Sequence, residues 1–60
     1  MNPINLLVVE DDVLMRDFIY QTLSQGPYVV ETTSKGIEAQ RMIERNSYHL
    51  ALLDVKLPDL

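Results

Sequence analysis

Three short apolar runs divide this chain at regular intervals. Residues 4–9 and 28–33 are rich in leucine and β-branched residues, which is typical of strands. A third strand is expected over residues 48–54, and its four consecutive apolar residues, Leu50 to Leu53, indicate burial on both faces. Glu31 and the neighbouring threonines indicate that the second strand is partly exposed, nearer an edge of the sheet.

The segment between the first two runs has the spacing of an amphipathic helix. The spacing predicts a helix over residues 13–25, with Asp12 suited to cap its start and Gly26-Pro27 to end it. Apolar residues four apart are expected to share its inner face, in the pairs Leu14/Phe18, Met15/Ile19 and Ile19/Leu23.

A second helix is expected from Ser34, as the N-cap, to about Asn46. Its inner face is expected to hold Gly36, Ala39, Met42 and Ile43, whereas Ile37 falls outside that face and is expected to be partly exposed.

Strands that alternate with helices favour a parallel sheet with right-handed crossovers. The fold class expected here is α/β, with β-α-β-α-β forming half of a flavodoxin-like doubly wound parallel sheet. In the usual strand order of such folds, 2-1-3-4-5, a chain with only three strands leaves its third strand at an edge.

Composition narrows the class of protein. Sixty residues form at most one small domain, with 47% hydrophobic and 23% charged residues, as in ordinary globular proteins. The net charge of −4 gives no basic patch for nucleic acid, and the lack of cysteine excludes disulfides and thiolate metal sites. Neither a membrane span nor a signal peptide is expected, so the default location is cytoplasmic.

Acidic residues follow two of the expected strands. Glu10, Asp11 and Asp12 come directly after the first strand, and Asp54 closes the third. Parallel strands deliver their last residues to the same edge of the sheet, where ligands of such folds bind. Clustered carboxylates repel one another unless a cation is present, and Mg²⁺ prefers such oxygen ligands. The sequence therefore predicts an acidic Mg²⁺ pocket at this edge.

Three groups of residues resemble the receiver domain of two-component response regulators. They are residues 8–12 followed by Arg16, then Gly36, Glu38 and Ala39, and finally residues 52–59, Leu-Leu-Asp-Val-Lys-Leu-Pro-Asp. The resemblance runs through the whole chain. It implies that Asp54 accepts a phosphoryl group from a phosphohistidine of a sensor kinase or phosphotransfer protein and forms an acyl phosphate.

The same resemblance implies a set of Mg²⁺ ligands. Asp11 would bind the metal directly, Glu10 through water, Asp54 through a carboxylate oxygen and Lys56 through its main-chain carbonyl. Asp12 is expected to be a helix cap or a rim residue, although the choice of Glu10/Asp11 or Asp11/Asp12 as the metal pair stays open.

Residues 1–60 are expected to be a truncated receiver, because the family has further strands that end in a Ser or Thr and in a Lys. Lys35 and Lys56 do not occupy that lysine's position. The resemblance implies a phosphoacceptor module rather than an enzyme, and this chain is expected to carry the phosphoacceptor half without the residues of the switch. An alternative is an inactive receiver fragment that self-associates through its exposed third strand. An aspartyl phosphohydrolase is disfavoured because Lys56 stands where a second acid is needed, and a nucleotide-binding domain because no glycine-rich turn follows the first strand.

Overall fold

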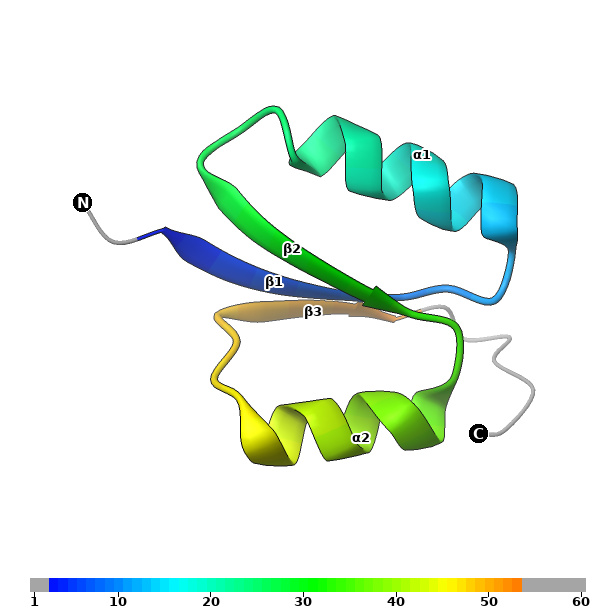
Figure 1. Cartoon of the computed structure of the whole chain (residues 1–60), viewed down its shortest axis with the longest axis vertical. Helices are drawn as coiled ribbons and strands as arrows, with labels where there is room; N and C mark the ends of the chain where they lie inside the picture. The colour runs from blue at the N-terminus through cyan, green and yellow to red at the C-terminus, as the bar shows by residue number, and fades with distance from the viewer. Residues whose placement is uncertain (1–2, 54–60) are drawn as a thin grey trace.

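The computed structural model describes residues 3–53 of the chain. Its elements follow the order β1 (Ile4–Val9), α1 (Val13–Leu23), β2 (Tyr28–Thr33), α2 (Gly36–Arg45) and β3 (Leu50–Leu53), as Figure 1 shows. This order confirms the expected β-α-β-α-β arrangement. Helix α1 and strand β3 are shorter than predicted, and Asp54, the last residue of the predicted third strand, lies outside the described residues.

The three strands form one parallel sheet in the order β2-β1-β3. Strand β1 pairs along its whole length with β2, from Ile4 with Tyr28 to Val9 with Thr33. On its other side it pairs with β3, from Leu6 with Leu50 to Val9 with Leu53. Strand β1 is therefore the central strand, and β2 and β3 are the edges of the described sheet.

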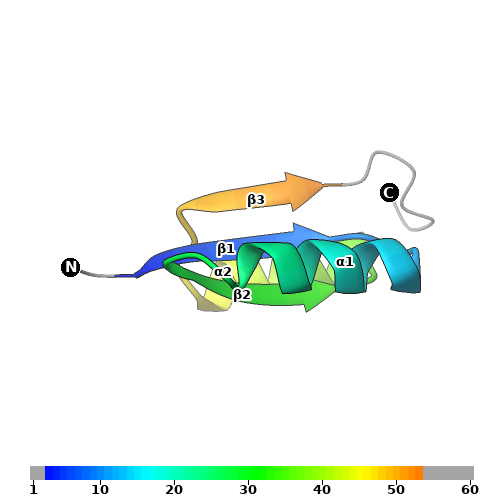
Figure 2. The same cartoon turned by 90° about the horizontal axis from the view of Figure 1, so that it is seen from above.

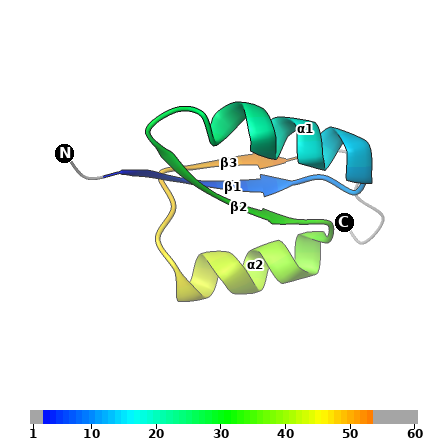
Figure 3. The same ribbon diagram turned by 45° about the horizontal axis from the view of Figure 1, so that its top comes forward.

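The two helices lie on opposite faces of the sheet, with α1 on one side and α2 on the other (Figures 1 and 3). Because both faces of β1 are covered, its last four residues, Leu6 to Val9, are all buried. Leu7 and Val9 form a buried cluster with Ala39 of α2, and alternation along the strand turns Leu6 and Val8 towards α1. The core is centred on β1, whose end carries the first acidic residues.

The prediction that β3 is buried on both faces is wrong for the described residues. Leu50, Leu52 and Leu53 are 55%, 39% and 58% exposed, and only Ala51 packs against the buried cluster. Among the described residues, α1 and α2 each contact β1 and β2 but not β3, and Figure 2 shows β3 standing beyond both helices. An apolar run indicates burial only where another element covers it.

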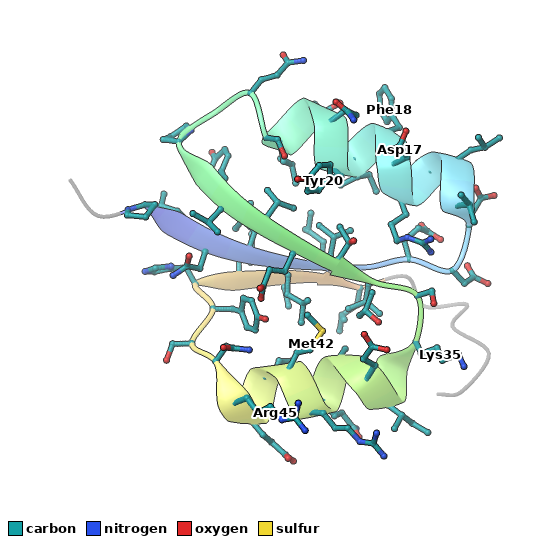
Figure 4. The ribbon with its side chains drawn as sticks, viewed as in Figure 1. Asp17, Phe18, Tyr20, Lys35, Met42 and Arg45 are labelled. Carbon is teal, nitrogen blue, oxygen red and sulfur yellow. The ribbon has the colours of Figure 1, made fainter. Side chains whose placement is uncertain are left out.

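Helix α1 also differs from its predicted packing. Ile19 and Leu23 are half-buried as expected, but Leu14 is 82% exposed, Phe18 66% and Met15 48%. Figure 4 shows Phe18 pointing away from the sheet. The helix lies over β1 and β2, so its sheet-facing side consists of Arg16, Ile19 and Leu23. The side that carries Leu14 and Phe18 faces outward, where no described residue covers it.

Helix α2 has its predicted inner face except at one position. Gly36 and Ala39 are buried, Met42 points towards the sheet (Figure 4), and Ile37 is partly exposed as expected, but Ile43 is 50% exposed.

Ser34 is not the N-cap of α2. Lys35 takes that position without a side-chain cap bond, and its carbonyl accepts the N–H of Ala39 at 3.0 Å. Two residues earlier, Thr33 Oγ1 accepts the N–H of Lys35 at 3.4 Å, so a hydroxyl from the end of β2 stabilises the turn before α2. Within residues 3–53, neither helix is long and apolar enough to cross a membrane.

Candidate functional site

The acidic residues after β1 lie in one tight turn between the central strand and α1. Glu10 remains attached to the sheet, because its N–H donates to the carbonyl of the buried Thr33 at 3.0 Å. Its carboxylate turns back over the loop, and Oε2 accepts the N–H of Asp12 at 3.2 Å. Glu10 is half-buried, whereas Asp11 and Asp12 are exposed. The turn thus presents its acids at the carboxyl end of the central strand.

Asp12 is the N-cap of α1, as one of the two predictions for it stated. Its backbone is extended, Oδ1 accepts the N–H of Met15 at 3.0 Å, and its carbonyl accepts the N–H of Arg16 at 2.9 Å. A carboxylate in this position satisfies an otherwise unpaired helix N–H and interacts favourably with the helix dipole.

Arg16 holds the same turn from the helix side. Its Nη1 donates to the carbonyl oxygen of Glu10 at 3.0 Å, in a part-buried position. The guanidinium therefore ties the first residue of the acidic turn to α1 through the main chain of Glu10. In the sequence, Arg16 served only to align the acidic residues with the family pattern. Its position four residues after the capping Asp12 is the signal that could have predicted its contact with the acidic turn.

The structure leaves the other half of the predicted site untested. Asp54 and Lys56 lie outside the described residues. Within residues 3–53, no group of three or more His, Asp or Glu side chains is arranged to hold a metal ion. What is described is the pairing of Val9 with Leu53, which are the residues immediately before Glu10 and Asp54 in the sequence. Both segments therefore reach the same edge of the sheet.

Comparison with known proteins identifies the family. The family model described as the response regulator receiver domain matches residues 6–60. Response regulator MprA of Mycobacterium sp. (strain KMS) is 38% identical over 58 residues, which cover 97% of this chain and 25% of the relative. Response regulator mcs4 of Schizosaccharomyces pombe is 31% identical over 58 residues, which cover 97% of this chain and 11% of the relative.

A third relative is the probable transcriptional regulatory protein SilR of Salmonella typhimurium, which is 29% identical over 55 residues. That alignment covers 92% of this chain and 24% of the relative. The chain thus spans a quarter or less of the length of these relatives. No solved structure shows a significant match.

The family model covers nearly the whole chain, and the sheet has the order and polarity expected from the resemblance. The acidic turn also follows the central strand, as the sequence predicted. The chain belongs to the response regulator receiver domain family.

Proposed function

We propose that this chain is the phosphoacceptor part of a two-component receiver and that Asp54 takes up the phosphoryl group. The observation that supports this most strongly is the register of β1 and β3. Val9 pairs with Leu53, and the next residue along each segment is acidic, Glu10 and Asp54 respectively. A carboxylate nucleophile and a pair of metal-binding acids at one sheet edge suit phosphoryl transfer.

The donor is a phosphohistidine of a sensor kinase or phosphotransfer protein. One carboxylate oxygen of Asp54 attacks the phosphorus, and the phosphorus–nitrogen bond to the donor breaks. The imidazole nitrogen keeps the electron pair and takes up a proton, and Asp54 becomes an acyl phosphate. The chain is consumed as an acceptor in this step and is not itself an enzyme. Such signalling takes place in the cytoplasm, without nucleic acid or membrane bound to this segment.

The donor groups of the chain fit Mg²⁺, which prefers carboxylate oxygens and water. Asp11, exposed at the tip of the turn, would bind it directly and Glu10 through water. Asp54 would add a carboxylate oxygen and Lys56 its main-chain carbonyl. Bound Mg²⁺ would draw negative charge from the nucleophile and the phosphoryl oxygens. Asp12 is the less favoured ligand, because its Oδ1 already accepts the N–H of Met15.

The test is labelling by a small acyl-phosphate donor in the presence of Mg²⁺, followed by intact mass spectrometry. The parent chain is expected to gain one phosphoryl group, and Asp54→Asn to gain none. Asp17→Asn is the matched control, since Asp17 is exposed on α1 away from the acidic turn, and it should label like the parent. Equal labelling of Asp54→Asn and the parent would disprove the assignment.

A second candidate function is self-association as an inactive receiver fragment, with residues 1–60 acting as an interaction piece. The observation that favours it is the composition of β3. This edge strand of the described sheet is Leu-Ala-Leu-Leu, without a charge or a proline that would discourage pairing with another copy.

Sedimentation equilibrium tests this second function. Leu52→Lys is expected to shift the equilibrium towards monomer, because a charge on an edge strand opposes pairing. Val29→Lys places the same charge on the opposite edge strand, β2, and should leave the association unchanged. A compact monomer of the parent chain at all concentrations would exclude this function.

A further inference from the structure

A tyrosine near the amino end of β3 joins three elements. Tyr48 lies between α2 and β3, and its hydroxyl donates to the carboxylate Oε1 of Glu31 on β2. The same hydroxyl accepts a bond from Nδ2 of Asn46, the C-cap of α2, at 3.5 Å. Asn46 Nδ2 also donates to the carbonyl of Met42 at 3.2 Å. We call Tyr48, Glu31 and Asn46 together the Tyr48 bridge.

The Tyr48 bridge crosses the central strand. Tyr48 packs against the buried cluster that contains Leu7, which is fully buried. Leu7 pairs with Glu31 of β2 on one side and with Ala51 of β3 on the other. A side chain that leaves the start of β3 and bonds to Glu31 therefore spans the width of the sheet above β1.

The protonation of Tyr48 suits this bond. Burial raises the pKa of the Tyr48 hydroxyl above its ordinary value of 10.0, and the hydrogen bond and negative charge of Glu31 raise it further. The donor Asn46 opposes these effects and lowers it. The hydroxyl thus stays protonated at neutral pH and donates a hydrogen bond to the carboxylate of Glu31.

The next residue attaches the start of β3 to β1. The N–H of His49 donates to the carbonyl of Asn5 at 2.8 Å, and the N–H of Asn5 donates to His49 Nδ1 at 2.9 Å. The imidazole nitrogen accepts a bond that a main-chain carbonyl would otherwise take in a parallel ladder. Two consecutive residues just before β3, Tyr48 and His49, thus bind the entry to this strand to β2 and β1 respectively.

Besides these anchors, the described part of the chain holds β3 only by its pairing with β1 and by the packing of Ala51 against the buried cluster. It has four residues, pairs only with β1, and its backbone lies close to neither helix there. Three of its four side chains are exposed leucines. Segments with few buried contacts open locally at low free energy.

We propose that Tyr48 is a positioning residue for phosphoryl transfer, which sets the placement of β3, and through it of Asp54, by its bond to Glu31. The proposal rests on the proposed function of Asp54. A short strand moves largely as a unit, so a shift of the residues just before β3 would be passed along the strand to the residue after its last. Displacement of a reacting group by about 1 Å can slow a reaction by about 100-fold.

The experiment compares Tyr48→Phe, Glu31→Gln and Glu31→Ala with the parent chain, at a temperature at which each is folded. Tyr48→Phe keeps the ring on the buried cluster and removes only the hydroxyl. Glu31→Gln keeps an acceptor oxygen and is the conservative variant that should preserve the bond. Glu31→Ala removes the acceptor. Because Glu31 is exposed, this variant should fold, and it tests the same bond should Tyr48→Phe fail to fold. Tyr20→Phe is the matched control, since Tyr20 lies on α1 away from the Tyr48 bridge.

Two measurements are made on each variant, amide hydrogen exchange of β3 and the rate of labelling by a small acyl-phosphate donor with Mg²⁺. Tyr48→Phe and Glu31→Ala should speed exchange in β3 about fivefold, the factor expected for one surface hydrogen bond, and leave β1 unchanged. Both should slow labelling by at least a similar factor. Glu31→Gln and Tyr20→Phe should stay near the parent in both measurements.

Unchanged labelling in Tyr48→Phe and Glu31→Ala would overturn the proposal, even if exchange in β3 became faster, because the bond would then be purely structural. Equal acceleration of exchange in β1 and β3 would overturn it as well, since that is general destabilisation. Failure of the proposed function is recognised separately, because Asp54→Asn would then label like the parent.

Discussion

The sharpest test of the acidic turn is the replacement of Asp12, which caps α1. Asp12→Ala removes the Oδ1 acceptor of the Met15 N–H, a bond of 3.0 Å at an exposed helix start. The N–H would then be left to water. The neighbouring acids Glu10 and Asp11 cannot replace it without a change in the loop, because the cap requires the extended backbone that Asp12 adopts, with φ −78° and ψ 120°.

The expected loss follows from the size of one cap and the length of the chain. An N-cap carboxylate contributes about 1 kcal/mol, within a range of about 0.5–2 kcal/mol. Unfolding entropy of about 2.1 cal/mol/K per residue gives about 0.13 kcal/mol/K for a chain of this length. The midpoint of thermal unfolding should therefore fall by about 8 °C. A total stability of about 3–9 kcal/mol leaves the variant folded at low temperature.

Circular dichroism of thermal unfolding measures this difference, with a chelator present so that metal makes no contribution. Asp12→Ser restores a cap and should recover most of the loss. Asp17→Ala is the same substitution at an exposed position inside α1 and should change stability by no more than about 0.5 kcal/mol. A midpoint for Asp12→Ala within about 2 °C of the parent, or a variant Asp12→Ser as unstable as Asp12→Ala, would refute the reasoning.

The same variants decide which acids bind the metal. With Glu10 and Asp11 as the pair, Asp12→Ser should bind Mg²⁺ as the parent does in a calorimetric titration, and Asp11→Asn should bind it much more weakly. Weakened binding by Asp12→Ser would instead favour Asp11 and Asp12.

Two further predictions concern the core and the pH. Leu7→Ala should lower the free energy of unfolding in urea by about 2–5 kcal/mol, because Leu7 is fully buried, whereas Leu14→Ala, at an 82% exposed position, should change it by no more than about 0.5 kcal/mol. The raised pKa of Tyr48 means that its protonated form is the one stabilised by folding. That stability is fully present below the ordinary value of 10.0 and is lost as the pH rises through the higher pKa of the folded chain. The advantage of the parent over Tyr48→Phe in urea unfolding should therefore shrink above this pH.

The order of elements could be predicted because each strand and helix has its own local period. Strand β1 was the clearest case, since an apolar run covered by helices on both faces is buried as its pattern indicates. The same reasoning failed for β3 and for the arc of Leu14 and Phe18. Apolar periodicity identifies a surface that is suited to burial, but it does not identify the element that covers it.

Contacts between distant residues were beyond sequence reasoning for a different reason. The position of the acids after two expected strands predicted the candidate site, and local cap chemistry correctly predicted that Asp12 caps α1. The bond of Tyr48 to Glu31 joins residues 17 positions apart, across a strand that lies between them. It depends on the register of three strands, and no local pattern specifies that register.

The turn after β1 and the strand β3, which form the two sides of the candidate site, are held in place by different kinds of contact. The turn after β1 is fixed by the bond of Glu10 to Thr33, by Arg16 and by the cap at Asp12. β3, the strand before Asp54, is held by its pairing with β1, by the packing of Ala51 and by the bonds of Tyr48 and His49 just before its first residue. In the proposed site, a metal held by both sides would bind more tightly when β3 already lies in place, because ordering the strand during binding would consume part of the binding free energy. We therefore expect the Tyr48 bridge, which lies near the amino end of β3, to affect metal affinity at the proposed site although it supplies no ligand.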